Sequence, residues 1–310
     1  MISRNSKIYI AGHNGMVGSA ILRKLKKKGY KNIIFQNSSI LDLIDQKKTY
    51  NYLKKNKPDV VFIAAAKVGG ILANQKNKAD FISDNLAIQN NLIIGSFKFK
   101  VKKLIFLSSS CVYPKDAPRP LKEKYFFSGN LEETNAPYAV AKLAGMKMCE
   151  SYNYQYKTDF KTLVPCNLYG ENDNFDLKSS HFLPALIRKI ENFKRGNTKS
   201  IKLWGNGKAK RELMHVDDLA EAAVYFMKKK HTQNYINIGT GKQLAIIEYA
   251  KKICEYLKVK PVFEFDLTKP VGMKTKVLDV SLARKLGWRS KITLRSGVKK
   301  TYSYFVKNYK

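Results

Sequence analysis

The segment Ile8-Tyr-Ile-Ala-Gly-His-Asn-Gly-Met-Val-Gly18 decides the fold. Its first four residues, Ile8–Ala11, form a short apolar run typical of a buried strand, and residues 17–28 have the apolar spacing of a helix. Gly12 and Gly15 lie between the strand and the helix, and Gly18 lies in the first turn of the helix. Glycines in such a turn allow the backbone to approach a pyrophosphate, and the helix N-terminus supplies N–H donors. We therefore predict a dinucleotide-binding turn near the start of the chain.

The same alternation of strand and helix continues along the first half of the chain. Buried strands are predicted at Ile8–Ala11, 33–36, 60–65, 104–108 and 162–167, and helices at 17–28, 45–55, 79–99 and 138–156. Strict alternation is typical of a parallel sheet with right-handed crossovers. The expected fold class is α/β, a doubly wound parallel Rossmann-type sheet with a smaller C-terminal α/β lobe.

The pattern changes after Gly170. Helices are predicted at 181–195 and 215–229 and strands at 201–204 and 235–238, followed by smaller elements at 244–257, 262–265 and 294–306. The acidic pair Asp217 and Asp218 suits the positive end of a helix dipole. We expect a dinucleotide-binding domain at 1–170, joined by about 213–243, and a substrate-binding lobe made of 171–212 and 244–310.

Composition places the chain among globular proteins. Its 310 residues are 44% hydrophobic, and no stretch approaches the roughly 20 apolar residues of a membrane helix. The polar start leads directly into a strand, so we expect a cytoplasmic protein without a membrane partner. The four cysteines are far apart and have no neighbouring His cluster, which favours reduced thiols and no metal site.

The net charge of +34 permits a different class of function, nucleic-acid binding or nucleotide sensing. Most of the basic residues are lysines, and they are scattered along the whole chain. Nucleic-acid readers favour clustered arginines for bidentate contacts, whereas solvated lysines need no partner. The charge therefore favours a solvated surface and no nucleic-acid partner. Salt-sensitive binding to random DNA would distinguish the two readings.

Tyr138 and Lys142 are four residues apart and so lie on one face of a predicted helix. A phenol is a poor acid or base at neutral pH, and a neighbouring ammonium is expected to lower its pKa. Ser109 follows the fourth strand, at the edge where open α/β sheets bind ligands. These residues predict a carbonyl reduction in which Tyr138 transfers a proton and Ser109 polarises the carbonyl.

These features resemble the extended short-chain dehydrogenase/reductases, and more narrowly the GDP-L-fucose synthase family. The segments that carry the resemblance are Ala64-Ala-Ala-Lys-Val-Gly-Gly-Ile71, Ser109-Ser-Cys-Val-Tyr-Pro-Lys115, Pro137-Tyr-Ala-Val-Ala-Lys142, Asn167-Leu-Tyr-Gly170, Asp173-Asn-Phe175, Ser180-His181, Trp204-Gly205 and Arg211-Glu212. The resemblance implies reduction of C4 of a GDP-4-keto-6-deoxy sugar by NADPH, after epimerisation at C3 and C5 in the same site.

The resemblance also implies roles for individual residues. Ser109, Tyr138 and Lys142 would carry the reduction, and Cys111 and His181 would be the base and acid of the epimerisation. The expected cofactor contacts are Gly12, Asn14, Gly15, Met16, Val17, Gly18, Ser38, Leu41, Asp42, Leu43, Leu107, Ser108, Lys142, Pro165, Asn167, Leu168 and His181. The expected substrate contacts are Lys189, Trp204, Arg211 and Val271. A homodimer built through helices, including residues 138–156, is implied as well.

Two departures from the family pattern keep alternatives open. Asn14 and Ser38 stand where bacterial members commonly have arginines for the 2′-phosphate of NADP, so NADP(H) is expected but NAD(H) is not excluded. Val271 replaces a carboxylate expected near the substrate. This change favours a second reading, a reductase without epimerase activity that acts on another GDP-4-keto sugar such as a GDP-heptose derivative. A nucleotide-sugar 4-epimerase is a third.

Overall fold

The computed structural model describes residues 2–269 and 272–309. Its centre is a six-stranded sheet in the order β10-β5-β4-β3-β1-β2, and every neighbouring pair is parallel. The strands are β1 (Ile8–Ala11), β2 (Ile33–Ile34), β3 (Val60–Ile63), β4 (Lys103–Leu107), β5 (Phe160–Pro165) and β10 (Tyr235–Ile238). The predicted α/β fold class is confirmed.

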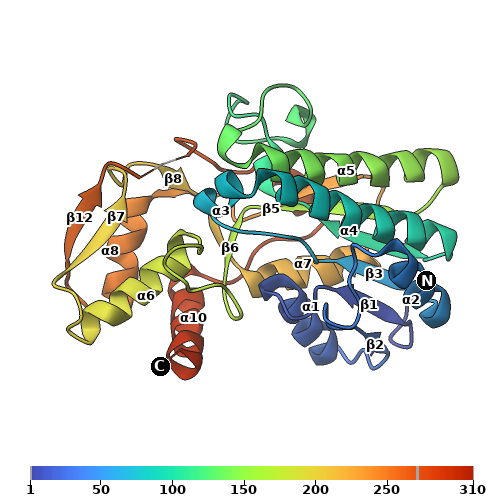
Figure 1. The fold of residues 1–310 in the computed structure, drawn as a ribbon, viewed down its shortest axis with the longest axis horizontal. Helices are drawn as coiled ribbons and strands as arrows, with labels where there is room; N and C mark the ends of the chain where they lie inside the picture. Colours follow the sequence, from blue (N-terminus) through green and yellow to red (C-terminus); the bar gives the residue numbers. More distant parts are fainter. Residues whose placement is uncertain (1, 270–271, 310) are drawn as a thin grey trace.

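Helices cover both faces of this sheet (Figure 1). On one face α1 (Met16–Lys27) packs against α7 (Val216–Lys228). On the other, α4 (Lys78–Lys98) packs between α2 (Gln46–Asn56) and α5 (Ala136–Tyr156). β1, β3, β4 and β5 are buried along their whole length, as crossover helices on two faces require, whereas the edge strand β2 is only partly buried.

The strand ends differ from the predicted ones at two functional places. β3 ends at Ile63 and is shorter than expected, whereas β5 begins at Phe160 and ends at Pro165, two residues earlier than predicted at both ends. After Pro165 the Cys166 N–H donates to the Ile238 carbonyl, and the chain then leaves the sheet. It forms a separate strand, β6 (Asn167–Tyr169), which pairs with β9 (Leu213–His215). The short helices α3 (Ile71–Lys76) and α9 (Ser281–Lys285) were not predicted.

The rest of the chain forms a smaller body at the left of Figure 1. It contains α6 (Phe182–Lys194), β7 (Ser200–Trp204), β8 (Lys210–Arg211), β11 (Leu244–Ala245), α8 (Ile246–Tyr256), β12 (Val262–Asp266) and α10 (Leu294–Asn308). Its buried hydrophobic side chains form a cluster separate from the one around the sheet. We propose the division into two domains on this basis, with one change: Leu278 and Trp288 pack with the sheet.

Charged side chains tie the two bodies together. The Glu212 side chain, which is 1% exposed, accepts from the N–H groups of Thr240, Gly241 and Leu278 at 2.6, 2.8 and 2.7 Å. On the other side, Arg23 of α1 forms ion pairs with Glu171 at 3.3 Å and Asp217 at 3.0 Å. Lys300 of α10 joins the same two carboxylates. Within residues 2–269 and 272–309, no helix is long and apolar enough to cross a membrane.

Candidate active site

The glycine turn after β1 brings the backbone close to its neighbours. Gly12 has a φ of +87°, and a Cβ there would lie 2.6 Å from the Ala65 nitrogen. A Cβ on Gly18 would lie 2.0 Å from the Gly12 oxygen, so only glycine fits at both positions. Gly15 is the exposed N-cap of α1 and carries no capping side chain. The first N–H groups of α1 are therefore accessible to an anion, which fits a dinucleotide pyrophosphate.

The segment after β2 lies beside this turn. The Asn14 side-chain amide donates to the Asn37 side-chain oxygen at 2.8 Å, and the neighbouring Ser38 is exposed. Leu41 is buried, whereas Asp42 is exposed and its carboxylate accepts the Ile44 N–H at 3.0 Å. The structure thus places this predicted set around the end of β2, where an amide, a hydroxyl and the Asp42 carboxylate are its polar groups.

The end of β4 positions the predicted serines. Leu107 and Ser108 are buried, and the Ser108 hydroxyl donates to the Met146 sulfur at 3.1 Å. Ser109 caps the short helix η1 (Ser110–Val112), and its hydroxyl oxygen accepts the Cys111 N–H at 3.3 Å. This turn places the Ser109 and Cys111 side chains, both partly exposed, at the carboxyl edge of the sheet.

Lys142 is held from the same strand. Its ammonium donates to the Leu107 carbonyl at 3.0 Å and lies 4.8 Å from the centre of the Phe106 ring and 5.8 Å from that of Tyr138. Burial lowers the pKa of Lys142 to about 7. Burial and the nearby Cys111 raise the pKa of Tyr138. The expectation that Lys142 lowers the pKa of Tyr138 is wrong, because the loss of solvation on burial outweighs an ammonium that is itself easily deprotonated.

Cys111 lies between two hydrogen-bond donors. Both the Asn135 side-chain nitrogen and the Lys276 ammonium are 3.4 Å from its sulfur. His181 is the N-cap residue of α6 and makes no capping hydrogen bond. The residue is exposed, yet desolvation by the surrounding protein and the Lys276 charge lower the pKa of His181. Lys276 therefore acts on both predicted epimerisation residues.

The predicted nicotinamide contacts lie at the neighbouring strand ends. Pro165 is the last residue of β5, which pairs with β4 so that Leu163 is beside Leu107. Asn167 and Leu168, in β6, follow directly and are partly exposed. They share the carboxyl edge of the sheet with Ser109, as the prediction requires.

The predicted substrate contacts are spread over the smaller body. Arg211 of β8 donates to the Met273 carbonyl at 2.6 Å, and the charges of Cys111 and Glu132 act on it, which brings it near the catalytic residues. Lys189 donates to the Lys202 carbonyl at 2.6 Å, and Asp266 and Lys202 are its charged neighbours. Trp204 ends β7, and Val271 lies outside the described residues. The structure groups Arg211 with the catalytic set, and gives no contact between that set and Lys189.

Asn135 and Lys276 were not predicted as site residues. Lys276 is 165 residues from Cys111 in sequence, so no spacing pattern connects them. It does lie in the segment 269–276 that drew attention through Val271, which was the available signal. No feature of the sequence pointed to Asn135, which lies one residue before α5.

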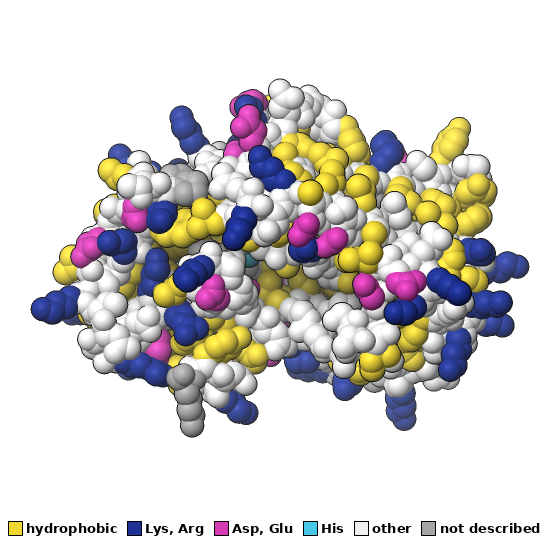
Figure 2. All heavy atoms as spheres, in the orientation of Figure 1, with side chains coloured by type: hydrophobic (Ala, Val, Ile, Leu, Met, Phe, Trp, Pro, Cys, Tyr) yellow, Lys and Arg dark blue, Asp and Glu magenta, His cyan; other side chains and the backbone are white. Residues whose placement is uncertain are grey.

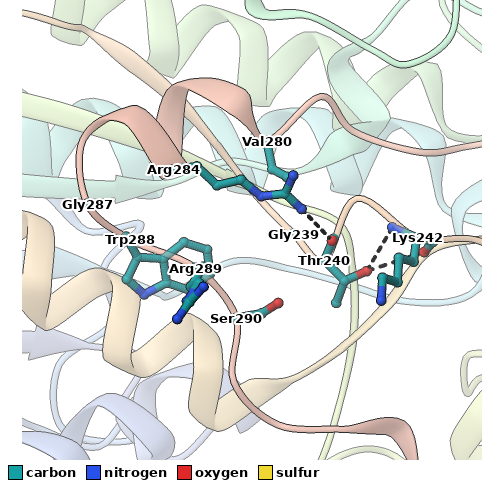
Figure 3. Close-up of a pocket in the computed structure, with 9 residues that line it drawn as sticks. All are labelled: Gly239, Thr240, Lys242, Val280, Arg284, Gly287, Trp288, Arg289 and Ser290. Atoms are coloured by element: carbon teal, nitrogen blue, oxygen red, sulfur yellow. Dashed lines mark hydrogen bonds between the residues drawn. The ribbon is translucent and has the colours of Figure 1, made fainter.

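A hollow crosses the face shown in Figure 2, between the sheet domain and the smaller body. A separate cavity of about 730 Å³ lies beyond the end of β10 (Figure 3). It is lined by Gly239, Thr240, Lys242, Val280, Arg284, Gly287, Trp288, Arg289 and Ser290. Among the residues that the structure describes, none of the predicted site residues lines it, so this cavity is separate from the candidate active site.

Comparison with known proteins agrees with this geometry. The family model described as "NAD dependent epimerase/dehydratase family" matches residues 8–239. The chain is 44% identical to a putative GDP-L-fucose synthase 2 of Arabidopsis thaliana, over 99% of this chain and 94% of that protein. Two solved structures from Campylobacter jejuni are similar: a GDP-D-glycero-L-gluco-heptose synthase (TM-score 0.92, 38% identity, 99% and 100% of the two chains) and a GDP-mannoheptose C4 reductase with NADP bound (TM-score 0.89, 40% identity, 99% and 100%). The chain therefore belongs to the GDP-L-fucose synthase family, within the extended short-chain dehydrogenase/reductases.

Proposed function

We propose that this protein is an NADP(H)-dependent enzyme that inverts C3 and C5 of a GDP-4-keto-6-deoxy sugar and reduces its C4 ketone. The observation that carries the proposal is the meeting of Tyr138, Lys142 and Cys111 at the carboxyl end of β4. An acid for a ketone oxygen and a base for an adjacent carbon are thus combined beside a dinucleotide-binding turn. The named activities of the relatives support the same substrate class.

The glycine turn at 12–18 and the first turn of α1 would hold the pyrophosphate of NADP(H). The cofactor supplies the hydride that reduces the ketone carbon. Asn14 and Ser38 would face its adenosine end, where amide and hydroxyl donors replace the arginines usual in bacterial relatives. Neutral donors bind a 2′-phosphate less strongly than a bidentate guanidinium, so we propose that NADPH is preferred over NADH by a smaller margin.

In the reduction, Tyr138 gives its phenolic proton to the oxygen of the former ketone, and Ser109 donates a hydrogen bond to that oxygen as negative charge develops. A raised pKa keeps the phenol protonated, and so ready to donate, at neutral pH. Lys142 fixes the geometry through the Leu107 carbonyl. Its pKa of about 7 leaves it a shared proton carrier that restores the phenol after transfer.

In the epimerisation, Cys111 would remove a proton from the carbon beside the ketone and His181 would return one on the opposite face. The ketone acidifies both neighbouring carbons, C3 and C5, so one pair of groups can serve both. The lowered pKa makes the imidazolium form of His181 a stronger proton donor, and also the less populated form at neutral pH. Cys111 lies in η1 of the sheet domain, and His181 lies at the start of α6 in the smaller body.

A second candidate is reduction without epimerisation, on a GDP-heptose derivative. The specific observation that favours it is Val271, together with 40% identity to a GDP-mannoheptose C4 reductase. Replacement of an acidic side chain by an apolar one alters the polar groups offered to the sugar. In this case Cys111 and His181 would be retained without exchanging protons.

The assembly is proposed to be a cytoplasmic homodimer formed through α4 and α5. Val140 and Tyr154 of α5 are 43% and 82% exposed, and Figure 2 shows hydrophobic side chains over this layer. Apolar residues on a helix pair suit burial against a second copy. Analytical ultracentrifugation tests this: Val140→Lys should shift a dimer to monomer, and a monomeric native protein would contradict the assembly.

The function is tested by NMR of the product after incubation with NADPH and GDP-4-keto-6-deoxy-D-mannose in deuterated water. The proposal predicts GDP-L-fucose with deuterium at C3 and C5. A reduced product that keeps its protons at both carbons would favour the reductase without epimerisation. No reduction of this sugar or of a GDP-4-keto-heptose, with NADPH or NADH, would overturn the proposal. Inversion at C4 of a GDP-sugar that carries a hydroxyl at C4, without net oxidation or reduction of the cofactor, would indicate the 4-epimerase.

A further inference from the structure

Lys276 is a buried lysine with an unusual partner. The residue is only 9% exposed, yet across residues 2–269 and 272–309 no carboxylate lies within ion-pair distance of its nitrogen. Its hydrogen bond goes to the Cys111 sulfur at 3.4 Å. Burying a charged group is costly unless an opposite charge or good acceptors compensate. The group in the position to compensate is the Cys111 sulfur.

The sulfur has a second nitrogen donor at the same distance. The Asn135 side-chain amide nitrogen also lies 3.4 Å from it. A neutral thiol is a weak acceptor and keeps its own proton, whereas a thiolate accepts several donors. Two converging donors, one of them charged, are therefore the environment of a sulfur anion.

We propose that Lys276 is a positioning residue that, with Asn135, holds Cys111 as the thiolate base for proton removal beside the substrate ketone. This inference rests on the epimerisation in the proposed function. It assigns to Lys276 no contact with the reacting carbon. The ammonium acts through the sulfur.

The proton transfer balances without a further reactant. The substrate C–H bond breaks and an S–H bond forms, and the electron pair of the C–H bond becomes the π bond of an enolate whose oxygen carries the charge. Protonation of that carbon from the opposite face by His181 restores the ketone with inverted configuration. The S–H proton then passes to solvent or to the histidine, which regenerates the thiolate.

The backbone fixes Lys276 independently of Cys111. The Val277 carbonyl accepts the Leu121 N–H at 2.9 Å, and the Leu278 N–H donates to buried Glu212 at 2.7 Å. These contacts lie one and two residues after Lys276. The ammonium is thus delivered to the sulfur by a segment anchored to the sheet domain.

Other charged groups face Cys111 from each neighbouring element. Arg211 of β8 is close enough for its charge to interact with the sulfur, and Glu132, before η3 (Glu133–Asn135), partly offsets that arginine. Tyr138 of α5 and His181 before α6 are the titratable groups on the remaining sides. Since Arg211 stays positive at all relevant pH values and Tyr138 stays neutral, His181 is the group among these whose titration can alter the pH profile of the sulfur.

The test measures alkylation of Cys111 by iodoacetamide between pH 6 and 10, with peptide mass spectrometry as the readout. Lys276→Met should slow alkylation at pH 7 by about tenfold and move the half-maximal rate to higher pH. Lys276→Arg, which keeps the charge, should restore most of the rate. Lys274→Met is the matched control, since Lys274 is exposed in the same segment, and should stay within about twofold of the native protein.

Cys149, Cys166 and Cys254 are 1%, 6% and 3% exposed, so the Cys111→Ser variant gives a low background. Equal alkylation profiles for the native protein and Lys276→Met would overturn the proposal. If Lys276→Met does not fold, Asn135→Ser, which removes only the amide donor, must show a smaller shift in the same direction, and no shift would overturn it too. Because alkylation needs no substrate, this result is separate from the product NMR. Deuterium exchange at C3 and C5 should fall in Lys276→Met while ketone reduction persists.

Discussion

Lys142→Met is the variant whose effect on the pH dependence of stability can be calculated most directly from the structure. Burial lowers the pKa of Lys142 from 10.5 to about 7. In the unfolded chain the amine keeps its proton up to about 10.5, whereas the folded protein releases it above about 7. Between these values the unfolded state binds more protons, so the stability contributed by this residue rises with pH. The slope is at most about 1.4 kcal/mol per pH unit.

From pH 7.5 to 9.5 the free energy of unfolding should therefore rise by about 2.5 kcal/mol more in the native protein than in Lys142→Met. Urea unfolding followed by circular dichroism at both pH values measures this difference, because groups common to both proteins cancel. Lys147→Met is the control: Lys147 lies on the same helix, but its side chain is 55% exposed and paired with Glu150. It should show the native pH dependence. If Lys142→Met shows it too, Lys142 does not titrate near pH 7 and the reasoning is refuted.

Three further outcomes are expected. Tyr138→Phe should lower kcat/KM for ketone reduction by about 10²–10⁴-fold while calorimetry finds NADPH affinity almost unchanged, and normal turnover would exclude Tyr138 as the acid. Glu212→Ala leaves three N–H donors without their carboxylate and should lower the free energy of unfolding by urea by about 3–5 kcal/mol. The control Glu255→Ala, at an exposed residue, should lower it by less than about 0.5 kcal/mol. Similar losses in the two variants would contradict the role of Glu212 in holding the two bodies together. Arg23→Met should cost about 1 kcal/mol at low salt and less at high salt, through its half-exposed pair with Asp217, and a salt-independent loss would mean that packing is responsible.

The fold could be predicted because the spacing of apolar residues along the chain indicates each strand and helix. Strands buried on both faces are continuous apolar runs, and the amphipathic segments between them indicate crossover helices. β2 was overextended to residue 36 because Phe35 looks like a strand residue, although it lies at the edge of the sheet and is 40% exposed. The break between β5 and β6 depends on pairing with β9, a contact made 46 residues further along the chain, and local pattern does not report it.

Some features of the candidate site could also be predicted from the sequence, and others could not. Tyr138 and Lys142 are one helical turn apart, so their association is visible in the sequence. Their protonation behaviour is not, because it depends on how completely the folded chain removes each group from water. The contact between Cys111 and Lys276 needs the whole path of the chain around Glu212 and is invisible to spacing. Sequence thus gives the chemistry of local pairs, and tertiary structure gives their charge states.

The Glu212 tie has a consequence for how such an enzyme changes its substrate. The chain from Asp266 to Leu278 is secured at both ends, by β12 pairing with β7 on one side and by Glu212 on the other. Under the proposed function, a substitution at position 271, between those ends, changes a side chain expected near the sugar, while the anchored end keeps Lys276 beside Cys111. New sugar specificities are then accessible through exchanges within one short segment. The scaffold thereby separates the evolution of recognition from that of catalysis.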